Sequence, residues 1–170
     1  MSESDFKKKI IAVIGKLRKT RRPSRNAFVD AAKNLSEWKQ RNDCSGLWHE
    51  PPLMATATLD DGFGHGLEII HLYAEAAGLK LLRLGLMLSP DDIIAKCLEH
   101  HPSILGLTML QFDTETSIKQ IRDGIRSDTQ IVAGGPLFAA DPGLAKRSGI
   151  DVVTKDAAAF MEYLLRFPLS

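Results

Sequence analysis

Residues 61–66 combine a carboxylate, an imidazole and three glycines in the order Asp-Gly-Phe-Gly-His-Gly. Glycine allows the backbone to take positive φ values and to approach a flat ligand closely. The carboxylate of Asp61 is suited to capping a following helix by accepting its first N–H groups. The imidazole of His65 is a common metal ligand. These residue types predict a ligand-binding turn or a helix cap, and both interpretations stay open for Asp61.

Two further segments of this kind follow apolar runs later in the chain. Thr108 and Leu110 end one run, and the pair Gly134-Gly135 ends another. A threonine hydroxyl at such a position can donate a hydrogen bond to a buried polar group. The glycine pair indicates either a tight turn or a close approach to a ligand. Since the carboxyl ends of parallel strands meet at one edge of a sheet, we expect the three segments to lie together.

The spacing of apolar residues predicts the elements that would position these segments. Strands are expected at residues 53–59, 79–88, 103–110, 130–133 and 152–154. Helices are expected at residues 66–77, 90–100, 114–126, 141–147 and 157–166. Alternating strands and helices predict a parallel sheet that is covered by helices on both faces. The fold class is therefore α/β, a flavodoxin-like (Rossmann-like) doubly wound sheet of five parallel strands.

The first 50 residues differ in composition from the rest of the chain. Residues 1–42 carry 12 Lys or Arg against 4 Asp or Glu, whereas the remainder carries 10 against 17. Apolar spacing predicts a helix at residues 4–19 and a second one from the N-cap Ser24 to about Asn42. Residues 42–52 are interpreted as a linker. We therefore divide the chain into a basic helical extension or partial cap (1–50) and the α/β domain (51–170).

Several function classes find no support in the chain. No apolar run approaches the roughly 20 residues of a membrane span, and no segment resembles a signal peptide, so a cytoplasmic protein is expected. Cys44 and Cys97 are far apart in sequence and are expected to be reduced. The phosphate-binding loop, the nucleophile elbow and the dinucleotide fingerprint are all missing. His71 is expected at the surface of its helix.

The three segments resemble those of the cobalamin (vitamin B12)-binding domain family over roughly residues 53–167. That family carries Asp-x-His-x-x-Gly after the first strand, Ser-x-Leu after the third and Gly-Gly after the fourth. The residues of this chain that match those motifs are Asp61, Gly66, Thr108 (in place of serine), Leu110, Gly134 and Gly135.

The chain departs from the family at Phe63. In the family this position holds the histidine that ligates cobalt from below, and phenylalanine has no lone pair for that bond. Three outcomes stay open: cobalamin bound without a protein ligand, ligation by His65 from a shifted helix start, or loss of the cofactor. The metal ligand is therefore left unassigned, with His65 as the candidate.

The resemblance also implies which residues bind the cofactor. A groove for the nucleotide tail would be lined by Thr108, Leu110, Gly134 and Gly135. The cofactor-binding residues from the first motif would be Asp61, Phe63, Gly64, His65 and Gly66.

The function implied by the resemblance is that of a corrinoid-binding protein without the usual histidine. It would carry a methyl group or the cofactor between partner enzymes, such as a methyltransferase or an activating enzyme. Because the chain shows no obvious substrate-activating domain, catalysis would need a partner, and the protein would be a component of a methyl-transfer system rather than a self-contained enzyme. The alternatives are a cobalamin- or haem-dependent sensor acting through the basic helices, and a degenerate domain without cofactor. A nucleic-acid partner is disfavoured because the basic segment 16–25 lacks interleaved aromatic residues.

Overall fold

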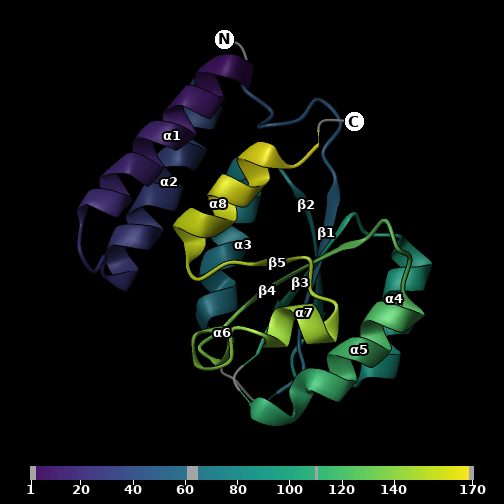
Figure 1. Ribbon diagram of the computed structural model, residues 1–170. Helices are drawn as coiled ribbons and strands as arrows, with labels where there is room; N and C mark the ends of the chain where they lie inside the picture. The colour runs from purple at the N-terminus through teal and green to yellow at the C-terminus, as the bar shows by residue number, and fades with distance from the viewer. Residues whose placement is uncertain (1–2, 61–64, 110, 169–170) are drawn as a thin grey trace. The chain divides into compact units, whose positions relative to one another are not determined.

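The computed structural model of the protein describes residues 3–60, 65–109 and 111–168, with only the backbone described for His65 and Phe112. It contains a sheet of five parallel strands in the order β2-β1-β3-β4-β5 (Figure 1). The strands are β1 (Leu53–Thr58), β2 (Lys80–Gly85), β3 (Ile104–Thr108), β4 (Gln130–Gly134) and β5 (Val152–Val153). This order is that of the flavodoxin-like doubly wound sheet, so the predicted fold class is confirmed.

The described helices agree with the predicted ones, with one addition. They are α1 (Glu3–Lys19), α2 (Arg25–Arg41), α3 (His65–Ala77), α4 (Pro90–His100), α5 (Glu115–Gly124), α6 (Leu137–Ala140), α7 (Leu144–Ser148) and α8 (Ala157–Arg166), with a 3₁₀ turn η1 at Phe112–Thr114. The predicted helix at 141–147 is wrong at its start, because Asp141 ends α6 and α7 begins only at Leu144. No described helix is both long enough and apolar enough to cross a membrane.

The predicted strand at 79–88 is too long. Strand β2 ends at Gly85, whose φ of +135° turns the chain out of the extended conformation. The apolar pattern continues through Leu88, but Leu86 and Met87 lie in a loop and are 51% and 67% exposed. Apolar residues after a glycine therefore do not belong to the strand here.

The chain divides into two compact units. The helical unit comprises Met1–Pro51, Glu68–Lys80 and Asp156–Ser170. The sheet unit comprises Pro52–Leu67 and Leu81–Lys155.

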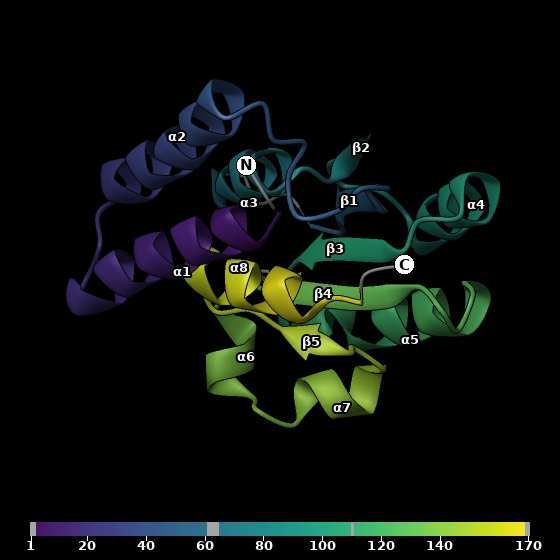
Figure 2. The same cartoon turned by 90° about the horizontal axis from the view of Figure 1, so that it is seen from above.

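The sheet unit has a core on the face that carries the odd-numbered residues of β1, β3 and β4. Because successive side chains of a strand point to opposite faces, these residues share one side of the sheet. Helices α4, α5 and α7 pack there, on one side of the strands (Figure 2). The core residues from strands and helices include Ala55, Leu105, Leu107, Ile131, Ile93, Cys97, Ile118, Ile121 and Leu144. Burial raises the pKa of the Cys97 thiol to about 11, which keeps this free cysteine unreactive.

The helical unit is built around the apolar face of α1. Phe6 and Ile10 are fully buried, and the ring of Phe6 stacks on Trp38 of α2 with centroids 5.5 Å apart. Helices α1 and α2 lie beside each other as an antiparallel pair (Figure 2). Arg18 of α1 forms ion pairs with Asp156, the N-cap of α8, and with Glu162 within α8. Ser24 caps α2 by accepting a hydrogen bond from the N–H of Ala27, as predicted.

The segment interpreted as a linker is packed rather than free. The N–H of Leu47 donates to the carbonyl of Ala77 at 2.8 Å, and Leu47 and Trp48 are buried. A Cβ on Gly46, which has a φ of +131°, would lie 2.3 Å from the same carbonyl. The segment therefore closes against the end of α3. The surface prediction for His71 is also wrong, because this residue of α3 is only 6% exposed.

Candidate cofactor-binding rim

Three strand ends meet in one row at the carboxyl edge of the sheet. Thr58 of β1 pairs with Thr108 of β3, and Thr108 pairs with Gly134 of β4. We call this row, together with the loops that follow it, the rim. The chain leaves β1 for β2 on one side and returns to β3 on the other, so the strand order reverses between β1 and β3. Ligands of open α/β sheets bind outside such a switch point.

The first two loops of the rim are tied together through Thr58. Its side chain is 1% exposed, and its hydroxyl accepts a hydrogen bond from the N–H of Met87 at 3.1 Å. The same hydroxyl donates to the carbonyl of Asp60 at 3.2 Å. This buried hydroxyl both donates and accepts a hydrogen bond. Breaking either bond would leave a buried polar group unpaired, so Thr58 holds its two partners firmly. Thr58 therefore joins the loop after β1 to the loop after β2.

A buried carboxylate extends this network to the loop after β3. Asp60 is 6% exposed, and its Oδ2 accepts a hydrogen bond from the N–H of Gln111 at 3.2 Å. The carbonyl of Gln111 in turn accepts from the hydroxyl of Thr114 at 3.0 Å. We did not predict Asp60 or Thr58 as site residues. The sequence feature that could have indicated them is a threonine at the end of an apolar strand, followed closely by two adjacent aspartates.

Gly135 brings the loop after β4 against the loop after β3. Its φ is +132°, and a Cβ added there would lie 2.0 Å from the carbonyl oxygen of Met109. The N–H of Met109 also donates to the carbonyl of Gly134 at 3.1 Å. Close backbone contact within the protein is therefore sufficient to require glycine at position 135. Gly134 therefore ends β4, and Gly135 turns the chain out of the strand at the rim.

Arg147 of α7 links the same two loops on the outside. Its guanidinium binds the carboxylate of Glu115 at the start of α5 and that of Asp141 after α6. Hydrogen bonds first to Asp141 and then to Glu115 raise the pKa of Arg147, and both carboxyl groups have a lowered pKa. Exposed ion pairs of this kind contribute little to the stability of the fold.

Thr108 offers an unused hydrogen-bonding group at the rim. Its side chain is half-buried at the end of β3, and no hydrogen bond of its hydroxyl to another described residue is formed. A threonine hydroxyl can donate one hydrogen bond and accept two. It is therefore available to a bound molecule.

The predicted site residues are only partly brought together. Thr108, Gly134 and Gly135 meet at the rim. Asp61, Phe63, Gly64 and Leu110 lie outside the described residues. His65 and Gly66 begin α3, and the side chain of His65 is not described. Within the described ranges, no cluster of three or more His, Cys, Asp and Glu could hold a metal ion.

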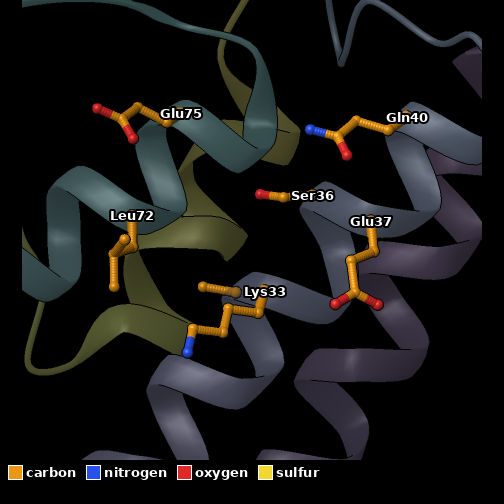
Figure 3. A pocket seen from close by; sticks show the side chains of 7 residues that line it. Lys33, Ser36, Glu37, Gln40, Leu72 and Glu75 are labelled. Atoms are coloured by element: carbon orange, nitrogen blue, oxygen red, sulfur yellow. The ribbon is translucent and has the colours of Figure 1, made fainter.

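A separate hollow lies in the helical unit, between α2 and α3. Its volume is about 170 Å³, and its lining comprises Ala32, Lys33, Ser36, Glu37, Gln40, Leu72 and Glu75. In Figure 3 the labelled side chains of Lys33 to Gln40 project from one helix, and those of Leu72 and Glu75 from the other. Pockets for drug-sized ligands span about 300–1,000 Å³. The hollow is too small for a large cofactor.

The sheet order defines the protein as a flavodoxin-like α/β domain, a fold class whose ligands bind at the switch point of the sheet. The chain belongs to the B12 binding domain family, whose model matches residues 53–164. The resemblance inferred from the three motifs is thereby confirmed, and cobalamin is the cofactor of this family. A search of curated proteins found no match.

Solved structures with the same fold include three corrinoid-related proteins. A novel cobalamin-binding protein from Desulfitobacterium hafniense has 21% identity and a TM-score of 0.75, covering 91% of this chain and 76% of that one. The monomethylamine corrinoid protein of Methanosarcina barkeri has 15% identity and a TM-score of 0.61, covering 84% and 68%. A methanol:cobalamin methyltransferase complex from the same organism has 18% identity and a TM-score of 0.56, covering 84% and 57%. Identities this low establish the shared fold alone.

The described rim fits a cofactor of this kind. The hydroxyl of Thr108 is free to bond a polar group, and Gly134 lies beside Thr108 in the same row of strand ends. Hydrogen bonds among Thr58, Asp60 and Gln111 hold the surrounding loops in place without using that hydroxyl. The rim thus combines a fixed backbone with an unused polar group.

Proposed function

We propose that the protein binds cobalamin along the rim and carries a methyl group, or the cofactor itself, between partner enzymes. The observation that supports this function is the row of Thr58, Thr108 and Gly134 at the switch point. This row lies inside the region matched by the B12 binding domain model. When bound, cobalamin supplies the cobalt at which methyl transfer takes place. The protein supplies binding and orientation.

Each described rim residue has a separate role in this proposal. The hydroxyl of Thr108 bonds a polar group of the nucleotide tail, and Gly135 lets the loop after β4 close against the loop after β3 beside it. Thr58 and Asp60 hold the loops that flank the tail. The predicted cofactor contacts are completed by Asp61, Phe63, Gly64, His65, Gly66 and Leu110.

Anaerobic reconstitution tests the proposal directly. The purified chain is mixed with hydroxocobalamin, and unbound cofactor is removed by gel filtration. We expect the protein peak to carry the visible absorbance of cobalamin in a ratio near one per chain. A colourless protein peak would reject the proposed function and favour the degenerate, cofactor-free alternative.

Replacing Thr108 with valine is expected to weaken cobalamin binding by about tenfold, which corresponds to about 1.4 kcal/mol. Valine keeps the shape of threonine but removes the hydroxyl, and this hydroxyl has no partner among described residues whose loss would destabilise the fold. An absorbance titration measures the affinity, and thermal unfolding checks the fold. Thr116→Val, at an exposed position of α5, is the matched control and should bind normally. Unchanged affinity of the Thr108 variant would contradict the proposed contact.

We further propose that position 63 gives cobalt no ligand. Replacing Phe63 with histidine is then expected to change the visible spectrum of the reconstituted protein and to tighten binding by about tenfold, or about 1.4 kcal/mol. Phe63→Leu, which also lacks a lone pair, should leave the spectrum as it is. If both variants bind cobalamin with the wild-type spectrum, position 63 does not face cobalt and the motif has been aligned wrongly.

The partner in this proposal is a methyltransferase or an activating enzyme. The chain covers 57% of the matched chain in the methanol:cobalamin methyltransferase complex, so additional parts are present there. Residues 1–50 would act as a partial cap or a docking arm. A methyl-transfer assay with a purified partner distinguishes a carrier from a cofactor-binding protein without transfer activity.

One observation favours the second candidate function, a sensor that acts through its basic helices. Around the turn between α1 and α2, Lys16, Lys19, Arg21 and Arg22 are exposed and form no ion pair with another described residue. A cluster of exposed basic residues of this kind attracts an acidic partner. Binding of the chain to duplex DNA, with an affinity that falls steeply with salt, would support this candidate.

A further inference from the structure

Two adjacent apolar residues are exposed in the loop after β2. Leu86 is 51% exposed and Met87 is 67% exposed. Single exposed apolar residues are common on protein surfaces and need no explanation. Here, two apolar residues in succession, directly after a strand end, are more than half exposed to solvent. Their position therefore calls for a physical reason.

The backbone of this loop is held in an unfavourable conformation. Met87 has a φ of +55°, a left-handed value that is uncommon for a residue with a side chain. The N–H of Met87 donates to the buried hydroxyl of Thr58, and the N–H of Leu88 donates to the carbonyl of Thr58 at 3.0 Å. Glycine or asparagine would adopt this conformation at lower cost. The surrounding structure thus maintains a strained turn that keeps a methionine exposed, and such strain clusters at functional sites.

The anchor of this loop is also part of the rim. Thr58 stands in the row with Thr108 and Gly134, at the switch point of the sheet. Both hydrogen bonds of the Leu86–Leu88 turn end on Thr58. The exposed apolar pair is therefore continuous with the cofactor-binding rim rather than located on a distant face.

We propose that Leu86 and Met87 form an apolar platform that contacts the corrin macrocycle of bound cobalamin. The macrocycle is broad and largely apolar, so it would cover surface that is otherwise in water. The unbranched thioether of methionine adapts its shape to an irregular surface. This inference rests on the proposed function. It adds two contact residues that lie outside the three sequence motifs.

Methionine oxidation provides a test that does not depend on activity. Met87 is the exposed methionine among the described residues, whereas Met54, Met109 and Met161 are at most 1% exposed. The protein is treated briefly with hydrogen peroxide, with and without bound hydroxocobalamin, and each sulfoxide is quantified by mass spectrometry. A methionine-containing reference peptide in the same tube corrects for any peroxide that the cobalamin consumes.

We expect bound cobalamin to slow the oxidation of Met87 at least tenfold relative to the reference peptide. The buried methionines should react slowly in both samples. Equal oxidation of Met87 in a sample that gel filtration shows to contain cobalamin would overturn the platform and leave the proposed function intact. Failure of the chain to bind cobalamin at all would reject both.

Substitutions separate a contact from a purely structural role. Met87→Gly removes the side chain and also relieves the positive φ, so we expect binding at least tenfold weaker with an unchanged or higher Tm. Leu86→Ala should weaken binding severalfold. Leu98→Ala is the matched control, because Leu98 is 47% exposed on α4 and should bind cobalamin normally. A Met87→Gly variant with wild-type affinity, or with a loss of affinity matched by a lower Tm, would contradict the inference.

Discussion

Replacing Gly135 with alanine is expected to lower the free energy of unfolding by about 2–4 kcal/mol and to abolish cobalamin retention. The added Cβ would lie 2.0 Å from the carbonyl oxygen of Met109, and the φ of +132° is strained for any residue with a side chain. The contacting atom belongs to the backbone, so the strain cannot be relieved by a side-chain rotation. The two loops must separate, and the turn beside Thr108 is lost. Denaturant unfolding and gel filtration with hydroxocobalamin measure the two effects.

Gly15→Ala provides the control for the same chemical change elsewhere in the chain. Gly15 lies within α1, and no atom is found within 4 Å of the position that its Cβ would take. Alanine is a better helix former than glycine by about 1 kcal/mol, so this variant should be slightly more stable. A Gly135 variant that is as stable as the wild type would show that the loops after β3 and β4 do not need their close approach.

The elements that the sequence predicts correctly are those specified by neighbouring residues. The amphipathic spacing of Phe6, Ile10 and Leu17 predicts α1, and all three side chains are buried. Ser24 is a recognisable cap because its side chain bonds a group only three residues away. The strand order also follows from local patterns, since alternating strands and helices leave few topologies available. Local periodicity therefore accounts for most of the fold.

Predictions fail where conformation depends on one torsion angle or on distant residues. The apolar residues continue through Leu88 and predict a longer strand, but β2 ends at Gly85, where the backbone takes a positive φ. His71 is buried because it shares a helix face with Leu67, four residues before it, and Ala74, three residues after it, and this spacing outweighs the polarity of the ring. In the helical unit, the segment before β1 packs against Ala77 through Gly46, and composition alone does not indicate that contact.

In the candidate site, too, contacts between residues that are distant in sequence are difficult to predict. The motif positions Thr108 and Gly134 can be recognised from the sequence, and their register in the sheet agrees with the predicted meeting of strand ends. The residues that hold the loops cannot be recognised in this way. The oxygen of Asp60 bonds a backbone N–H that is 51 residues away. The donor is a backbone N–H, which nearly every residue type carries, so the identity of residue 111 does not predict this hydrogen bond. It can be recognised only from the positions of the two loops in the folded protein.

Asp60→Ala tests whether this distant bond supports the cofactor site. Removing the carboxylate leaves the N–H of Gln111 without that acceptor, and hydrogen bonds to charged groups are worth about 1.5–3 kcal/mol. We expect a loss of stability in this range. We also expect cobalamin binding at least tenfold weaker, because the loops after β1 and β3 would no longer be tied together. Denaturant unfolding and an absorbance titration with hydroxocobalamin measure the two quantities.

Asp60→Asn separates the hydrogen bond from the negative charge. The asparagine side chain keeps one oxygen that accepts from the N–H of Gln111, at nearly the same size. If the role of Asp60 is to hold the two loops, the asparagine variant should retain most of the stability and affinity that alanine loses. Equal damage from both substitutions would instead assign the effect to the charge of the carboxylate. Since Thr58 donates to the backbone carbonyl of Asp60, that link persists in both variants and cannot account for a difference between them.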